Sequence, residues 1–238
     1  MTHAVVTNDN PDIVVCRAEY RHDARRPGRI IDGLPESTTI DRKTTLELLL
    51  DGRIQGFLWS KLIRRSCLGD DPFPELTSQS DFVGFVRAVD KAQRVTIIPD
   101  VLYRYVRRPD SLTRVRTPVL GNLLIARDAL LDIARRDPGL NGDTQRFDYF
   151  AAWFYCAAVA FTPIRSNSSQ TTRDEGLRRA REGLQGIRLL PIALRRPSVG
   201  LSLLAIRHAG PLYGLTVGIL LTVKDRARRF AIGTSPCA

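Results

Sequence analysis

Two short apolar runs, with helix-type patterns between and after them, constrain the fold of this chain more than any other feature. Residues 12–16 (DIVVC) follow Asn10-Pro11 and predict a buried strand. Residues 94–98 (RVTII) predict a second strand, which Pro99 should end because proline has no N–H to donate within a sheet. Strands separated by helical segments indicate an α/β fold.

Helix-type spacing of apolar residues fills the stretch between these runs. Asp41 is a favourable N-cap for a leucine-rich helix that Asp51-Gly52 should end. Residues 57–65 form a second amphipathic segment, and residues 69–74 (GDDPFP) are rich in turn-forming residues. Apolar residues then recur at helical spacing over 82–89, so we expect a second long helix there.

The C-terminal part of the chain differs in both pattern and charge. From residue 119 the pattern becomes helical, residues 163–172 read as a polar linker, and further helical segments follow over 174–189 and 199–223. Residues 163–238 hold thirteen Lys/Arg against four Asp/Glu, whereas residues 1–162 hold twenty-three against twenty-one. The net charge of +11 therefore lies mainly in the tail, and no nucleic-acid-binding motif accompanies it.

The metal-ligating residue types are scattered. The four cysteines lie far apart without CxxC spacing and the three histidines are also dispersed, so neither a zinc site nor a disulfide framework is indicated. Asp70-Asp71 stands in a Gly/Pro turn and is interpreted as a solvated turn rather than a metal site.

Several elements, taken in order, resemble the second half of a family-2 glycosyltransferase of the GT-A type. They are DIVVC at 12–16, GFLWSKLIRR at 56–65, FPEL at 73–76, SDFVGFVRAVDKA at 80–92 and VTIIPDVLYRYVRRPDSLT at 95–113. The resemblance implies an incomplete GT-A-like mixed sheet with helices over residues 1–115. A helical segment over 116–162 should pack on it, and a cationic, mainly helical extension should follow over 163–238.

The sequence departs from the family pattern in two ways. The elements of the first half are absent, including the Asp-x-Asp motif that binds the nucleotide-sugar and a divalent metal (Mg²⁺ or Mn²⁺) in that family. Ser80 stands where the family has Glu, and Ser60 where it has Asn. An incomplete sheet would expose an unpaired edge, so we expect self-association unless the C-terminal helices cover it.

The resemblance assigns Asp81 the role of general base toward the acceptor hydroxyl. The alternative is that Ser80-Asp81 only caps the following helix. The implied substrate-binding residues come from the tryptophan motif and from the loop after the second strand: Trp59, Lys61, Arg104, Arg107, Arg108 and Ser111. An indole can stack on a sugar ring and a guanidinium matches phosphate oxygens, but a core tryptophan and a solvated basic loop are the alternatives.

Residues 198–223 are apolar apart from Arg207 and His208, and the uninterrupted part is short for a membrane span. We expect this region to pack on the protein or to lie at an anionic membrane surface through residues 195–229. The N-terminal residues do not resemble a signal peptide, so we expect a cytoplasmic protein, peripheral at the inner face of the membrane in the second case.

Two functions remain open at this point. The chain is a glycosyltransferase-like protein that transfers a sugar from a nucleotide-sugar to a glycan or lipid-linked acceptor, or it is a non-catalytic remnant or accessory subunit of such an enzyme. Nucleic-acid binding is a third, weaker alternative that rests on charge alone.

Overall fold

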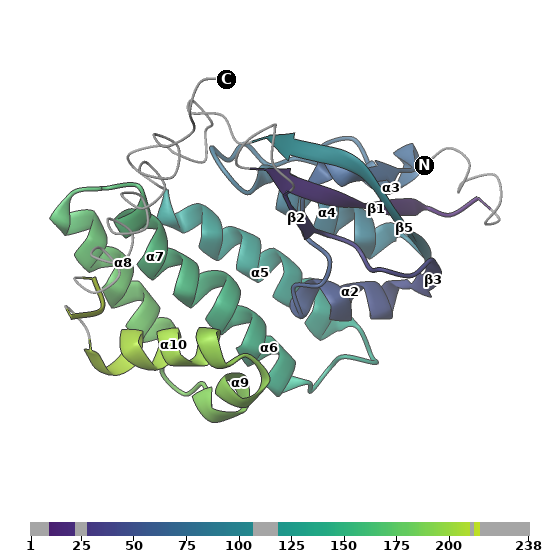
Figure 1. Cartoon of the computed structure of the whole chain (residues 1–238). Helices are drawn as coiled ribbons and strands as arrows, with labels where there is room; N and C mark the ends of the chain where they lie inside the picture. Colours follow the sequence, from purple (N-terminus) through teal and green to yellow (C-terminus); the bar gives the residue numbers. More distant parts are fainter. Residues whose placement is uncertain (1–9, 22–27, 107–118, 210–211, 215–238) are drawn as a thin grey trace, which may run out of the picture. The chain divides into compact units, whose positions relative to one another are not determined.

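The computed structural model describes residues 10–21, 28–106, 119–209 and 212–214, and its strands form one mixed sheet (Figure 1). The strand β1 (Ile13–Arg21) lies parallel to β5 (Arg94–Val106), and β3 (Thr38–Asp41) pairs antiparallel with the first part of β5. On the other side of β1, β4 (Lys61–Ile63) pairs with its first half and β2 (Arg29–Ile31) with its second half. The predicted α/β fold with a mixed sheet is confirmed.

The predicted strand at residues 12–16 is the centre of this sheet. Ile13, Val14, Val15 and Cys16 are at most 1% exposed, because the strand has neighbours on both sides and both of its faces are covered. A strand buried on both faces is expected to be continuously apolar rather than alternating, which explains why this run stands out in the sequence.

The strand predicted at residues 94–98 continues to Val106, so Pro99 does not end it. The register shows the reason: Cys16 pairs with Ile98, but Arg17 pairs with Val101 and Ala18 with Tyr103. Pro99 and Asp100 therefore fall in an irregularity where the ladder is interrupted, and a bulge is where a strand tolerates a proline.

Two helices in the first part of the chain follow the predicted pattern. Helix α2 (Arg42–Leu50) begins after Asp41, whose side chain accepts the Thr44 N–H at 2.8 Å, and it ends at Asp51-Gly52. Helix α4 (Ser80–Lys91) buries its apolar side chains as predicted for 82–89. Residues 57–65 differ from a single amphipathic segment, since they divide into a 3-10 turn, η1 (Leu58–Ser60), strand β4 and the start of α3 (Arg65–Leu68).

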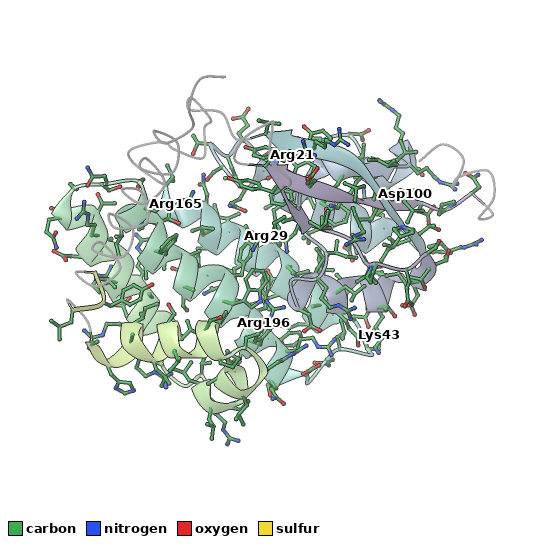
Figure 2. All side chains as sticks on the ribbon, in the orientation of Figure 1. Arg21, Arg29, Lys43, Asp100, Arg165 and Arg196 are labelled. Atoms are coloured by element: carbon green, nitrogen blue, oxygen red, sulfur yellow. The ribbon has the colours of Figure 1, made fainter. Side chains whose placement is uncertain are left out.

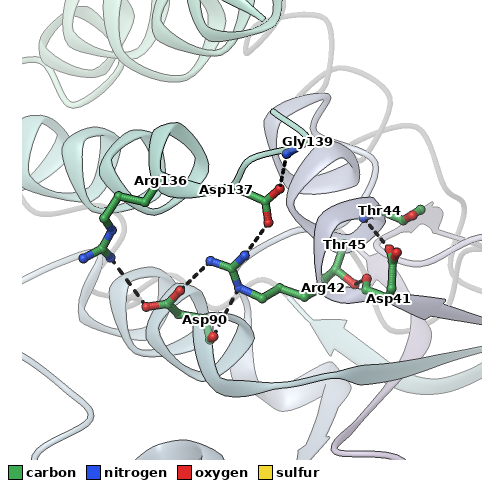
Figure 3. A network of polar contacts seen from close by, with 8 residues as sticks. All are labelled: Asp41, Arg42, Thr44, Thr45, Asp90, Arg136, Asp137 and Gly139. Carbon is green, nitrogen blue, oxygen red and sulfur yellow. Dashed lines mark hydrogen bonds and ion pairs between the residues drawn. The ribbon is translucent and has the colours of Figure 1, made fainter. Parts of the chain in front are cut away.

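Arg42 joins three elements at the start of α2 (Figure 3). Its guanidinium donates to the Asp90 carboxylate at 2.7 Å, to the Asp90 carbonyl at 3.2 Å and to Asp137, which follows helix α5 (Leu120–Arg136). The Asp137 side chain is 9% exposed and also accepts the Gly139 N–H at 3.0 Å. The planar guanidinium suits this arrangement because it offers several donors in fixed directions.

We expect Arg42→Met to lower the free energy of unfolding by about 1.5–3 kcal/mol, the usual range for hydrogen bonds to charged groups. Arg42→Lys keeps the charge, but its single ammonium cannot bind both carboxylates as the two-pronged guanidinium does. Its free energy of unfolding should therefore lie between those of the methionine variant and the wild type. Urea unfolding of the three proteins measures this. A lysine variant as unstable as the methionine variant would show that charge at this position contributes nothing.

By its contacts the chain divides into two compact units, residues 1–112 with 121–150, and residues 113–120 with 151–238. The first unit holds the sheet, α2, α3, α4, most of α5, and α6 (Thr144–Phe150). The second holds the π-helical turn η3 (Ala151–Cys156), α7 (Ala157–Arg165), α8 (Gln170–Gly183), α9 (Leu189–Arg195) and α10 (Pro197–Ala209). The described residues of the C-terminal region are thus mainly helical, as predicted, while residues 210–211 and 215–238 lie outside the described ranges. The roles predicted for 1–115, 116–162 and 163–238 stay predictions.

The predicted linker at 163–172 is shorter than expected, since α7 includes Pro163 and α8 begins at Gln170. Pro163 has no N–H for the Val159 carbonyl four residues earlier. Helix α8 approaches that carbonyl at Gly176, where a Cβ atom would overlap the Val159 oxygen. The glycine therefore allows α8 to pack closely against the turn that the proline loosens.

Among the described residues, one helical stretch, Thr144–Arg165, is long and apolar enough to cross a membrane by length and composition. Its mean hydropathy is 1.2 and 56% of the most apolar window is buried within the protein, as in core helices of soluble proteins.

Candidate active site

Asp81 lies in the first turn of α4, not at its N-cap position. The N-cap position is Gln79, which has a left-handed backbone (φ 68°) and makes no side-chain capping bond. Ser80 donates its hydroxyl to the Pro74 carbonyl at 2.9 Å, and Asp81 accepts the N–H of its neighbour Phe82 at 2.8 Å. One carboxylate oxygen of Asp81 thus remains for another partner among the described hydrogen bonds.

The environment of Asp81 suits a proton acceptor. Partial burial raises the pKa of its carboxyl above the usual value, and this effect outweighs the opposing hydrogen bond from Phe82 and the positive charge of Lys61. A carboxylate with a raised pKa is a stronger proton acceptor than an ordinary aspartate. The side chain is half-buried, so it also keeps access to a ligand.

Trp59 belongs to a row of stacked, partly exposed aromatic rings. It stacks on Phe57 with the ring centroids 4.8 Å apart, on Tyr103 at 4.5 Å and on Tyr105 at 5.8 Å. Tyr105 in turn stacks on Tyr20 at 5.4 Å. Trp59 comes from η1, Tyr103 and Tyr105 from β5, and Tyr20 from β1, so the sheet aligns the rings.

The segment that carries Trp59 also borders the start of α4. A Cβ atom at Gly56 would overlap the Phe82 ring, so the backbone before Phe57 lies directly against the residue that follows Asp81. Only glycine allows this approach, because any side chain would push the segment away from α4. The segment that carries Phe57 and Trp59 therefore packs against the residue that follows Asp81.

Lys61 has a buried partner instead of a place at the surface. Its side chain is 0% exposed, and the ammonium binds the Asp32 carboxylate at 2.6 Å and the Ser60 hydroxyl oxygen at 3.0 Å. Asp32 is equally buried and accepts the Gly33 N–H at 3.0 Å, the Gln55 N–H at 2.8 Å and the Ser60 hydroxyl. Lys61, which the family resemblance assigned to substrate binding, is thus buried in an ion pair with Asp32.

The backbone at Asp32 turns this carboxylate inward. Asp32 and Gly33 both have left-handed backbones, with φ of 66° and 71°. Aspartate tolerates that conformation better than most residues, and glycine adopts it without strain. The Asp-Gly dipeptide was the available sequence signal. It does not reveal the partner of the Asp32 carboxylate, which lies 29 residues later, in the motif around Trp59.

The Lys61 side chain, which comes from β4, also packs against the part of α4 near Asp81. Its ammonium is 4.7 Å from the centre of the Phe85 ring, and Phe85 is one helical turn after Asp81. Burial lowers the pKa of Lys61, while the charges of Asp32, Cys16 and Asp81 act in the opposite direction. Lys61 therefore links the buried Asp32 to the candidate base electrostatically.

Arg104 lies on β5 with a largely exposed side chain, and its guanidinium is 3.6 Å from the Glu19 carboxylate. Glu19 is held by Arg21 at 2.8 Å and by the Gly28 N–H at 2.7 Å. The pKa of Glu19 is lowered, chiefly by the hydrogen bond from Arg21 and to a smaller extent by the hydrogen bond from the Gly28 N–H. Arg107, Arg108 and Ser111 lie outside the described residues.

Across the described ranges, no group of three or more His, Cys, Asp or Glu side chains is placed to hold a metal ion. Asp70 and Asp71 are exposed in the loop between α3 and α4, as the sequence predicted for a solvated turn. Among the described residues, none therefore belongs to a group of carboxylates of the kind with which the resemblance would hold Mg²⁺ or Mn²⁺.

Comparison with known proteins identifies the fold. No protein-family model matches the chain, and no curated protein matches it. A solved structure of S. aureus TarS, residues 1–349 in complex with UDP-GlcNAc, matches 94% of this chain with a TM-score of 0.57 and 15% identity. The chain therefore has a GT-A-like α/β fold, a mixed sheet followed by helices. The chain spans 63% of that TarS chain, and at this identity the likeness establishes the fold alone.

Proposed function

We propose that this chain is a glycosyltransferase-like protein of the family-2 type that carries the acceptor-binding half of a GT-A domain. The observation that carries the proposal is the half-buried Asp81, with its raised pKa, at the start of a helix against which the segment carrying the stacked Trp59 packs at Gly56. The TarS-like fold supports it, and UDP-GlcNAc bound to TarS makes a nucleotide-sugar the natural donor class.

In the proposed reaction Asp81 accepts the proton of an acceptor hydroxyl while the hydroxyl oxygen bonds to the anomeric carbon of the donor sugar. The bond from that carbon to the diphosphate oxygen breaks, and the nucleoside diphosphate leaves with the bonding electrons. Direct displacement inverts the anomeric configuration. Trp59 and its neighbours supply flat surfaces for a glycan or lipid-linked saccharide, since aromatic faces pack against the C–H faces of sugars.

Lys61 and Asp32 act as positioning residues in this proposal, because both are buried and neither can touch substrate. Their ion pair holds the backbone directly after Trp59 and Ser60 in place. It also keeps the positive charge of Lys61 near Asp81. Arg104 is the exposed cation of β5 nearest to the aromatic row in sequence, and we propose it, with Arg107, Arg108 and Ser111, for the diphosphate.

A second role is that of an accessory subunit that binds the acceptor for a separate catalytic chain. The aromatic row favours it, because such a surface can hold a saccharide without a nucleotide site.

Calorimetric titration with UDP- and dTDP-sugars in the presence of Mn²⁺, together with assays for sugar transfer to saccharide acceptors, tests the proposal. Donor binding and transfer support the enzyme. Saccharide binding without donor binding supports the accessory role, and the absence of both contradicts the two roles together.

We expect Trp59→Ala to weaken saccharide binding by up to about tenfold, because it removes the ring on which Phe57 and Tyr103 stack. The chain has two tryptophans, so the matched control is Trp153→Ala in η3. Intrinsic-fluorescence titration with oligosaccharides measures both variants. Equal effects of the two substitutions would contradict a role for the aromatic row.

A further inference from the structure

Helices α9 and α10 expose leucines to an unusual degree. Leu190 and Leu194 are 70% and 77% exposed on α9, and Leu201 is 66% exposed on α10. Leu212, just after α10, is 64% exposed. The inner sides of both helices are buried through Leu189, Ile192, Leu203 and Ile206, so the helices are anchored while the outer leucines are in water.

The outer leucines belong to one surface because the two helices pack tightly. A Cβ atom at Gly200 would overlap the backbone of Ala193, so α10 and α9 touch at these residues. Leu201 and Leu194 directly follow this contact pair in the sequence. Leu190 and Leu194 are four residues apart and share a face of α9. We call Leu190, Leu194 and Leu201 the hairpin leucines.

The charge around the hairpin leucines has one sign. The sequence has no Asp or Glu between residues 183 and 224. Arg188 precedes α9 and is exposed, Arg195 ends α9 and is exposed, and Arg196, labelled in Figure 2, forms the turn to α10. His208 is exposed near the end of α10. Exposed leucines on a stretch of chain whose charged residues are all basic match the combination of apolar chains and negative headgroups at an anionic membrane surface.

We propose that the α9–α10 hairpin docks on an anionic lipid surface, with the hairpin leucines inserted at the headgroup boundary and the arginines against the phosphates. The two helices have 7 and 13 residues, so they lie on the surface and do not span it. A second protein copy is a poorer fit, because the same basic surface on both copies would bring like charges together. This proposal goes beyond sugar transfer and is independent of it.

The test is co-sedimentation of the full chain with phosphatidylcholine vesicles that contain or lack about 30% phosphatidylserine, a fraction that gives a strongly negative surface. We expect binding to the anionic vesicles only. The combined Leu190→Ser, Leu194→Ser and Leu201→Ser variant should bind at least about tenfold more weakly, because each serine removes an inserted apolar side chain. Arg188→Gln with Arg195→Gln should weaken binding about fivefold per charge and reduce its salt dependence.

The matched control replaces exposed apolar residues of the other unit, Leu62→Ser with Ile125→Ser, which should leave vesicle binding unchanged. Circular dichroism of each variant verifies that it is folded. Equal loss in the control and hairpin variants would overturn the proposal. Failure of the wild-type protein to bind anionic vesicles would also overturn the proposal. If light scattering then shows an oligomer that the hairpin substitutions dissociate, the leucines join copies of the chain instead.

Discussion

Asp81→Asn is expected to lower sugar transfer by about 10²–10⁴-fold, the contribution of a positioned general base. Asparagine has nearly the same shape, and its side-chain oxygen can still accept the Phe82 N–H. The stability of the protein at neutral pH should not fall and should rise slightly. The carboxyl has a raised pKa because its burial disfavours the charge, and the substitution removes that buried charge.

The same pKa shift fixes the sign of the pH dependence. The raised folded-state pKa means that Asp81 destabilises the folded protein as pH rises from its unfolded-state pKa toward its folded-state pKa. The rate of sugar transfer should increase with pH as the Asp81 carboxyl loses its proton. We call this increase the acidic limb, and its midpoint should lie at a higher pH than the pKa of an ordinary aspartate. Lys61→Met should move the limb to still higher pH, since the Lys61 charge opposes the shift.

The chain offers a matched control in Asp148, another partly buried aspartate of the first unit whose pKa burial raises. Asp148→Asn should share the small gain in stability and leave transfer unchanged. Transfer kinetics and thermal unfolding of the two variants distinguish the roles. A loss of stability in Asp81→Asn together with normal transfer would show that Asp81 is structural.

The largest effect on stability is expected at the buried ion pair. Asp32→Ala should lower the free energy of unfolding by about 3–5 kcal/mol, because it leaves the Lys61 ammonium buried without its counter-charge. The Gly33 and Gln55 N–H groups and the Ser60 hydroxyl lose their acceptor at the same time. Lys61→Met should be less harmful, since Asp32 keeps these three donors.

Chemical unfolding monitored by circular dichroism measures these differences. The control is Lys43→Met, which removes the more exposed Lys43–Glu47 pair in α2 and should cost at most about 0.5 kcal/mol. If Asp32→Ala costs no more than this control, the pair does not hold the Trp59 segment in place.

The contrast between Asp41 and Asp32 shows how far sequence reading reaches in this protein. Asp41 caps α2 through a residue three positions away, so local preference was enough to place the helix. Asp32 meets Lys61 only because the left-handed turn and the sheet bring distant segments together. The continuation of β5 past Pro99 likewise depended on the register with β1, which a single strand does not reveal.

The candidate site divides in the same way. The resemblance indicated Asp81 and Trp59, and the structure gives both an environment consistent with their proposed roles. It also suggested Lys61 as a substrate contact, but the lysine's burial and its aspartate partner arise from packing and were not visible in the motif. The stacking of Tyr103 and Tyr105 on Trp59 was missed because it joins a strand to a turn more than forty residues earlier in the sequence.

The irregular pairing of β1 with β5 has a consequence for how this protein can change in length. From Cys16 to Ala18 one strand advances two residues, while its partner advances five, from Ile98 to Tyr103. Adding or removing a single residue in that stretch would reverse the side of the sheet on which Tyr103 and Tyr105 emerge. Single-codon insertions and deletions there would therefore remove the aromatic partners of Trp59, whereas a substitution leaves the alternation of sides unchanged.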